Sequence, residues 1–92
     1  MNKKQEYTTN ELEQIFLINV KEANYKAVET MIPYVKDKNI YNQAIIICAE
    51  YGYLRIIKLL YPYISGYNTR EKARFLANIN DNYNCSRYLG SD

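Results

Sequence analysis

The sequence contains no histidine and no tryptophan, and it has only two cysteines and three glycines. Without histidine the chain lacks the commonest general base and metal ligand, which excludes Ser-His-Asp and Cys-His catalysis and most zinc sites. Three glycines are too few for a glycine-rich phosphate loop. Cys48 and Cys85 lie in apolar segments without metal-binding spacing, so we expect them to be buried. We therefore expect no enzyme activity, no cofactor, no metal site and no small-molecule substrate.

Long hydrophobic runs and a strong charge of one sign are also missing. The longest apolar run, residues 44–49, is far too short to cross a bilayer. Twelve basic and ten acidic residues leave a net charge of +2, which is below the excess typical of nucleic-acid-binding proteins. The first residues include two lysines but no apolar segment like that of a secretory signal. We expect one soluble domain of 92 residues, without membrane contact, in the cytoplasm or nucleus.

The chain resembles itself when it is shifted by 29 residues. The shift places Ile18 on Ile47 and Leu76, and it aligns Asn10, Asn39 and Asn68, which we expect to cap three helices. The predicted organisation is an N-terminal arm over 1–9, repeat 1 over 10–38, repeat 2 over 39–67, and a C-terminal capping repeat over 68–92.

Each repeat is predicted to contain two helices. After Gly52, five residues follow the i, i+3, i+4, i+7, i+8 pattern of an amphipathic helix: Tyr53, Ile56, Ile57, Leu60 and Tyr61. Pro33 and Pro62 are expected to end or kink the second helices, which leaves short connectors over 36–38 and 65–67. These patterns predict an all-α fold of about three stacked helix-turn-helix hairpins. An irregular bundle of five or six helices is the alternative.

The start of the first helix has two possible capping boxes. Thr8 with Glu11 is one, and Asn10 with Glu13 is the other.

The middle repeat resembles the helix-turn-helix part of an ankyrin repeat. Its segment QAIIICAEYGYLRIIKLL contains the family's small pair, turn glycine, aliphatic pair and leucine pair in order: Cys48-Ala49, Gly52, Ile56-Ile57 and Leu59-Leu60. Repeats 1 and 3 have Ala23 and Asp81 at the turn, and the family's Thr-Pro-Leu-His tetrapeptide is absent. A period of 29 leaves little room for the family's β-hairpin. The resemblance covers roughly residues 10–89 and implies an ankyrin-like α-solenoid.

The resemblance also implies a function, which is binding another protein through the exposed side of the first helices and the adjacent turns. The corresponding positions here are Glu13, Lys21, Glu22, Asn42, Glu50, Tyr51, Glu71, Ile79 and Asn80. An ordinary solvated surface is the alternative for each of them. Tyr51 and Ile79 stand out, because exposed aromatic and aliphatic side chains commonly anchor interfaces.

The predicted role is that of a non-enzymatic adaptor or inhibitor. A composition rich in Ile, Asn, Tyr and Lys is similar to that of divergent ankyrin repeats in large DNA viruses, protists or intracellular bacteria, and this resemblance implies a host protein as the partner. The alternative function, which the nearly neutral charge disfavours, is nucleic-acid binding through Lys21, Lys26, Arg55, Lys58, Lys72, Arg74 and Arg87. Since three repeats are near the minimum for a stable array, the expected state is a monomer or a weak homodimer.

Overall fold

The computed structural model describes residues 6–90, and within that range it contains α-helices and short 3₁₀ turns but no β-strand. The predicted all-α class is therefore confirmed. The helices are α1 (Thr9–Lys21), α2 (Tyr25–Met31), α3 (Lys38–Tyr51), α4 (Leu54–Leu60), α5 (Tyr67–Ile79) and α6 (Tyr83–Gly90). The 3₁₀ turns are η1 (Ile32–Tyr34) and η2 (Tyr61–Tyr63).

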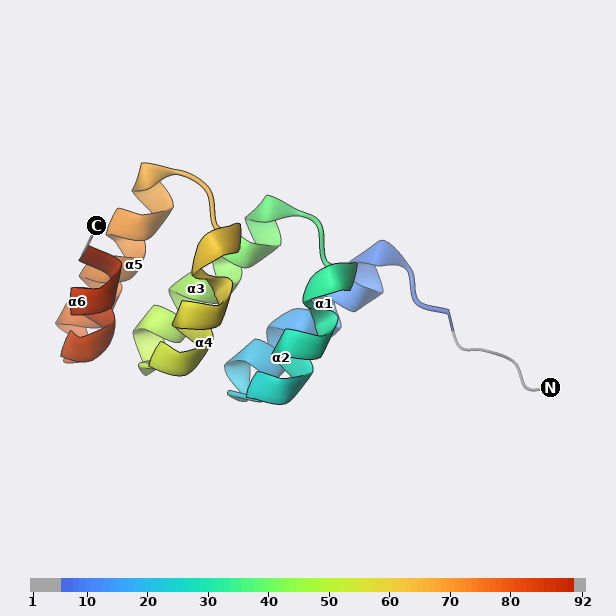
Figure 1. Ribbon diagram of the computed structural model, residues 1–92, viewed down its shortest axis with the longest axis horizontal. Helices are drawn as coiled ribbons and strands as arrows, with labels where there is room; N and C mark the ends of the chain where they lie inside the picture. The colour runs from blue at the N-terminus through green and yellow to red at the C-terminus, as the bar shows by residue number, and fades with distance from the viewer. Residues whose placement is uncertain (1–5, 91–92) are drawn as a thin grey trace.

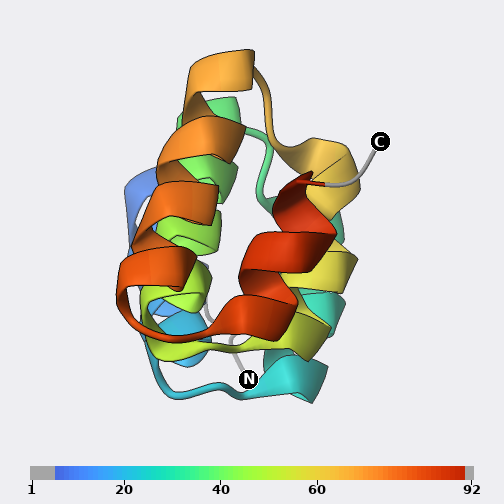
Figure 2. The same ribbon diagram turned by 90° about the vertical axis from the view of Figure 1, so that its left-hand side faces the viewer.

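The helices pair into hairpins, α1 with α2, α3 with α4 and α5 with α6, which lie side by side in chain order (Figure 1). The longer helices α1, α3 and α5 form one layer, and the shorter helices α2, α4 and α6 form the other (Figure 2). Successive hairpins touch mainly through the longer helices.

Two opposite edges of the molecule carry the loops. The turns inside the hairpins lie along one edge, which we call the turn edge (residues 21–24, 50–53 and 79–83). The links between hairpins lie along the other, which we call the connector edge (residues 32–37 and 61–66) (Figure 1).

The helices α1, α3 and α5 begin earlier in the sequence than they would if Asn10, Asn39 and Asn68 capped them. Their N-caps are Thr8, Asp37 and Gly66, which are also 29 residues apart. The period is therefore correct, but the prediction that asparagines cap these helices is wrong. The three asparagines lie in the first turns instead: Asn10, Asn39 and Asn68.

Capping side chains explain this shift at α1 and α3, whereas the N-cap of α5, Gly66, has no side chain to accept a hydrogen bond. The Glu11 amide donates to Thr8 Oγ1 at 3.1 Å, and the Thr8 amide donates to Glu11 Oε1 at 2.9 Å, which is the first of the two predicted capping boxes. The Asn39 amide donates to Asp37 Oδ1 at 2.9 Å. Lys38 and Tyr67 are consequently already helical, so they do not belong to connectors, and Thr9 does not belong to an arm. Residues 1–5 and 91–92 of the predicted arm and capping repeat lie outside the described residues.

The two prolines end the second helices of the first two hairpins, as predicted. Helix α2 stops at Met31, and Pro33 lies in the 3₁₀ turn that follows it. Helix α4 stops at Leu60, and Pro62 lies in the equivalent turn. Proline lacks an amide hydrogen and collides with the preceding helical turn, so the chain leaves the helix at both places.

The turns inside the hairpins share one backbone conformation despite their different sequences. Ala23, Gly52 and Asp81 occupy the same register position, and their φ angles are 58°, 82° and 64°. Glycine adopts this left-handed conformation freely, whereas other residues lose roughly 1–2 kcal/mol. In all three turns the next amide donates to a carbonyl five residues back, Asn24 to Asn19, Tyr53 to Cys48 and Asn82 to Ala77, so the same local hydrogen bond closes the turn with or without glycine.

The core lies between the two layers of helices. Its largest fully buried side chains are Phe16, Val20, Val28, Ile45, Cys48, Ile57, Leu60, Cys85 and Leu89. Small residues at Ala44, Ala73 and Ala77 allow the longer helices to approach one another closely.

The third hairpin ends the stack of described hairpins with polar residues. Phe16 and Ile45 are fully buried, but Arg74 at the same register is exposed. Ala49 is likewise buried, whereas its equivalent Asn78 is exposed. These substitutions leave water-compatible side chains where no further hairpin covers the layer.

Side chains at one repeated position join each hairpin to the preceding one at the turn edge. The Tyr53 hydroxyl donates to the Lys21 carbonyl at 3.0 Å. At the equivalent position, Asn82 Nδ2 donates to the carbonyls of Ala49 and Glu50, each at 3.0 Å. Both side chains satisfy carbonyls at the end of the preceding long helix, which have no partner within that helix.

The connector edge is held in the same manner by two residues of α3. The Tyr41 hydroxyl donates to the carbonyls of Val35 at 2.6 Å and Ile32 at 3.0 Å. Asn42 Oδ1 accepts from the Ser65 amide at 3.0 Å. The middle long helix, α3, is therefore attached to its neighbours at both of its ends.

We predict that Asn82→Ala lowers the free energy of unfolding by about 1–3 kcal/mol, because one partly buried and one exposed carbonyl lose their donor. Urea unfolding followed by circular dichroism measures this change. Asn84→Ala is the matched control, since the Asn84 side chain accepts only a long hydrogen bond of 3.4 Å from Arg87. Equal stability of the two variants would contradict the bridging role of Asn82.

A second prediction concerns the close approach of Asn82 to the middle turn. A Cβ at Gly52 would lie 2.7 Å from Asn82 Oδ1. Gly52→Ala is therefore expected to lower the melting temperature more in the wild type than in an Asn82→Ala background, where only the backbone strain of about 1 kcal/mol remains. Thermal unfolding of the four chains tests this, and an equal loss in both backgrounds would contradict it.

Candidate interaction surface

Six of the nine residues predicted to bind a partner lie together on the turn edge. They form three pairs, one at the end of each long helix, which occupy the same two positions of the 29-residue repeat: Lys21 and Glu22, Glu50 and Tyr51, and Ile79 and Asn80. All six are exposed. Because the long helices stack side by side, the three pairs follow one another along the edge (Figure 1).

Tyr51 is the central aromatic residue of this row. Its side chain is 59% exposed, and its ring centroid lies 5.5 Å from that of Tyr53. The hydrogen bond from Tyr53 to the Lys21 carbonyl holds the Tyr53 ring, so Tyr51 packs against a fixed neighbour. An exposed aromatic ring on a rigid support loses little conformational entropy when a partner covers it.

The other three predicted residues lie in the first halves of the long helices, away from the turn edge, and two of them have hydrogen bonds within the chain. Glu13, Asn42 and Glu71 share a register, and all three are half-buried. Asn42 is hydrogen-bonded to Ser65. Glu71 accepts hydrogen bonds from the Arg74 guanidinium, which lowers the pKa of this carboxyl group below its ordinary value. The structure therefore separates this set from the turn-edge row.

Tyr83 belongs to the same edge but is absent from the predicted set. Its ring is 55% exposed, and its hydroxyl donates to Asp81 Oδ1 at 2.8 Å, which raises the pKa of Tyr83. The sequence could have indicated Tyr83, because it directly follows the last turn and occupies the repeat position of Tyr25 and Leu54. Both of those residues are half-buried.

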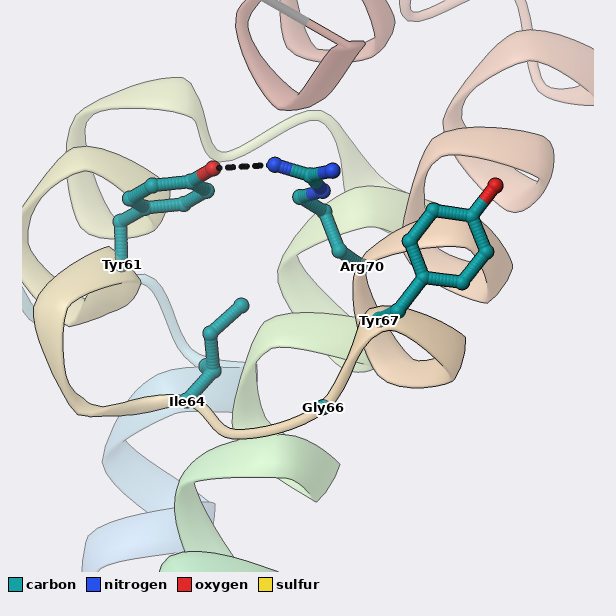
Figure 3. Close-up of a pocket in the computed structure, with 5 residues that line it drawn as sticks. All are labelled: Tyr61, Ile64, Gly66, Tyr67 and Arg70. Atoms are coloured by element: carbon teal, nitrogen blue, oxygen red, sulfur yellow. Dashed lines mark hydrogen bonds between the residues drawn. The ribbon is translucent and has the colours of Figure 1, made fainter. Parts of the chain in front are cut away.

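Shallow hollows open on the connector edge. One, of about 310 Å³, is lined by Tyr61, Ile64, Gly66, Tyr67 and Arg70 (Figure 3). Arg70 Nη1 donates to the Tyr61 hydroxyl at 3.2 Å across this hollow. The equivalent hollow of the preceding hairpin has a volume of about 500 Å³ and includes Pro33, Lys36, Lys38, Pro62 and Tyr63 in its lining. Both are open to solvent.

The basic residues of the nucleic-acid alternative are divided between the two layers. Lys26, Arg55, Lys58 and Arg87 lie on the short helices, whereas Lys21, Lys72 and Arg74 lie on the long ones. Several have partners within the chain. Lys26 pairs with Glu29 at 3.5 Å, and the Arg55 guanidinium lies 4.0 Å from the centroid of the Tyr25 ring. These residues therefore do not form one continuous row.

Comparison with protein-family models, curated proteins and solved structures finds no significant match.

The remaining reactive groups are the two cysteines, which lie in the core. Burial, with a smaller contribution from Cys85, raises the pKa of Cys48 to about 12. Burial also raises the pKa of Cys85.

Between residues 6 and 90, no group of three or more cysteine, aspartate or glutamate side chains is placed to hold a metal ion. In the same range, no helix is both long and apolar enough to span a membrane.

We predict that neither thiol reacts with a disulfide reagent at pH 8–9 unless the protein unfolds, because both are buried and burial raises the pKa of each. In the unfolded chain thiols lose their protons near pH 8.5, whereas the folded Cys48 thiol, with a pKa of about 12, retains its proton at that pH. The thiol contribution to stability is thus complete below about pH 8.5 and falls as the pH rises toward the folded pKa. Absorbance-monitored thiol titration with and without urea tests this, and rapid reaction of the folded protein would contradict it.

Proposed function

We propose that this protein is a non-enzymatic protein–protein interaction module, built as a short ankyrin-like α-solenoid that binds its partner through the turn edge. One observation supports the proposal above the others. Three stacked hairpins repeat an exposed pair of residues at one register, with Tyr51 at the centre of the row and Ile79 at one end.

The chemistry of this row suits a protein surface. Tyr51 and Ile79 are 59% and 57% exposed and offer apolar area for burial. The remaining side chains, Lys21, Glu22, Glu50 and Asn80, offer charges of both signs and an amide. An apolar centre with a mixed polar surround is the usual composition of a protein interface. Stacked helices lie about 8–10 Å apart, so three hairpins extend the row over roughly 20 Å.

The ankyrin-like part of the proposal depends on local features of the hairpins. Each has a long and a short helix joined by a left-handed turn, and successive hairpins stack through their long helices. The connectors lack β-hairpins in the described residues, so the proposed array is a shortened form of that architecture. Such a module acts by occupying a partner's surface as an adaptor. In a virus or parasite, it would act as an inhibitor of a host protein, in the host cytoplasm or nucleus.

The test is affinity capture from cell lysate with the wild-type chain and with a Glu50→Arg/Tyr51→Ala double variant. We expect a protein partner that is retained after nuclease treatment, and that binds the double variant at least roughly tenfold more weakly. Quantitative mass spectrometry identifies the partner, and titration with the purified partner gives the affinity ratio.

The matched control is Glu29→Arg/Tyr67→Ala, which makes the same changes at exposed residues away from the turn edge. This control is expected to bind the partner like the wild type. Equal loss of binding in both double variants would refute the turn edge as the interface. Recovery that disappears with nuclease would refute the protein-interaction proposal in favour of nucleic-acid binding.

A further inference from the structure

Apolar residues are exposed on the outward sides of the first and last long helices. On α5, Phe75 is 62% exposed. On α1, Ile18 is 52% exposed and Ile15 is half-buried. These two patches lie at opposite ends of the row of hairpins, because α1 and α5 are the outermost members of the long-helix layer (Figure 1).

The register identifies the α5 patch as a stacking surface. Phe75 occupies the position of Leu17 and Ile46. Leu17 is only 8% exposed and Ile46 is partly buried, and both precede another hairpin. Ile46 lines the groove between α3 and α5 together with Thr69 and Lys72. This position is thus the one that a long helix presents to the next hairpin, and on α5 no described hairpin covers it.

The register identifies the α1 patch as the opposite stacking surface. Ile18 occupies the position of Ile47 and Leu76, which are partly buried and pack against the core. Both of these residues belong to helices that follow another hairpin, whereas no described hairpin precedes α1. Ile18 and Ile15 are therefore the residues that a long helix presents to the preceding hairpin.

We propose that copies of this chain associate head to tail, with α5 of one copy stacked on α1 of the next. Phe75 of the first copy then packs on Ile15 and Ile18 of the second, as Ile46 packs beside α5 within the chain. The contact resembles the α1–α3 and α3–α5 interfaces, with Ile15 at the position of Ala44 and Ala73. This inference is independent of the proposed partner, since Phe75 and Ile18 lie outside the turn-edge row.

Charge and polarity limit the contact to the long helices. Arg74 lies across the end of α6, since a Cβ at Gly90 would come within 2.8 Å of Arg74 Cδ. Arg74 and the neighbouring Asn78 are exposed and discourage burial of the whole end. On α1, Glu11 is exposed and occupies the same position of the 29-residue repeat as Ile40 and Thr69. Arg74 is paired with Glu71 of its own helix, so these side chains make parts of both ends polar without adding a charge attraction between the two ends.

The association is expected to be weak. An interface of one helix on one helix is smaller than the roughly 800 Å² per partner of a stable complex. A head-to-tail contact uses two different surfaces, so it either closes into a ring or continues as an open chain of molecules. The mass in solution is therefore expected to rise with concentration beyond that of a dimer.

Analytical ultracentrifugation of the full chain from about 10 µM to about 1 mM tests the proposal. Phe75→Glu and Ile18→Glu are each expected to be monomeric throughout. An equimolar mixture of the two is expected to form a dimer and nothing larger, because only one intact α5 patch and one intact α1 patch can meet. Tyr67→Glu, which changes an equally exposed aromatic residue elsewhere, is expected to associate like the wild type.

Recovery of the dimer on mixing also establishes that both variants are folded. A monomeric wild type over the whole range would overturn the proposal. So would association of Ile18→Glu alone, which would indicate pairing of two α5 patches, or failure of the mixture to dimerise when the wild type associates.

Discussion

The contact between successive long helices is the interaction on which the rest of the structure depends. A single hairpin of about 20–25 residues cannot bury its apolar face alone, so stacking on a neighbour supplies the core. Alanines at 44, 73 and 77 permit close approach, and isoleucine and phenylalanine side chains fill the space between the layers. Tyr53 and Asn82 then join each hairpin to the one before it at the turn edge.

This repeated contact also determines which residues are available to partners. Because each hairpin is set beside the last in the same orientation, the residue pairs at 21–22, 50–51 and 79–80 lie along one edge. The same geometry leaves a different stacking surface at each end of the row. Polar residues cover part of the α5 end, and Phe75 leaves part of it apolar. Partner binding and self-association therefore use separate surfaces of one stack.

Local patterns predicted the helices well and the contacts of the candidate site less well. The Thr8 and Glu11 capping box, the stops at Pro33 and Pro62, and the glycine turn at Gly52 are each decided within a few residues. The asparagine caps were wrong because a threonine and an aspartate two residues upstream accept the first amide hydrogens instead. Helical phase placed Asn42 on an exposed side, but its role in holding Ser65 depends on a residue far along the chain.

The sequence by itself determined the all-α class, the 29-residue period and the approximate positions of the helices, because periodicity, proline and capping act over short range. Only the tertiary structure decided exposure. Leu17, Ile46 and Phe75 are equivalent in sequence, yet they range from buried to 62% exposed. The reason is that burial depends on whether another hairpin lies alongside, which no local pattern records.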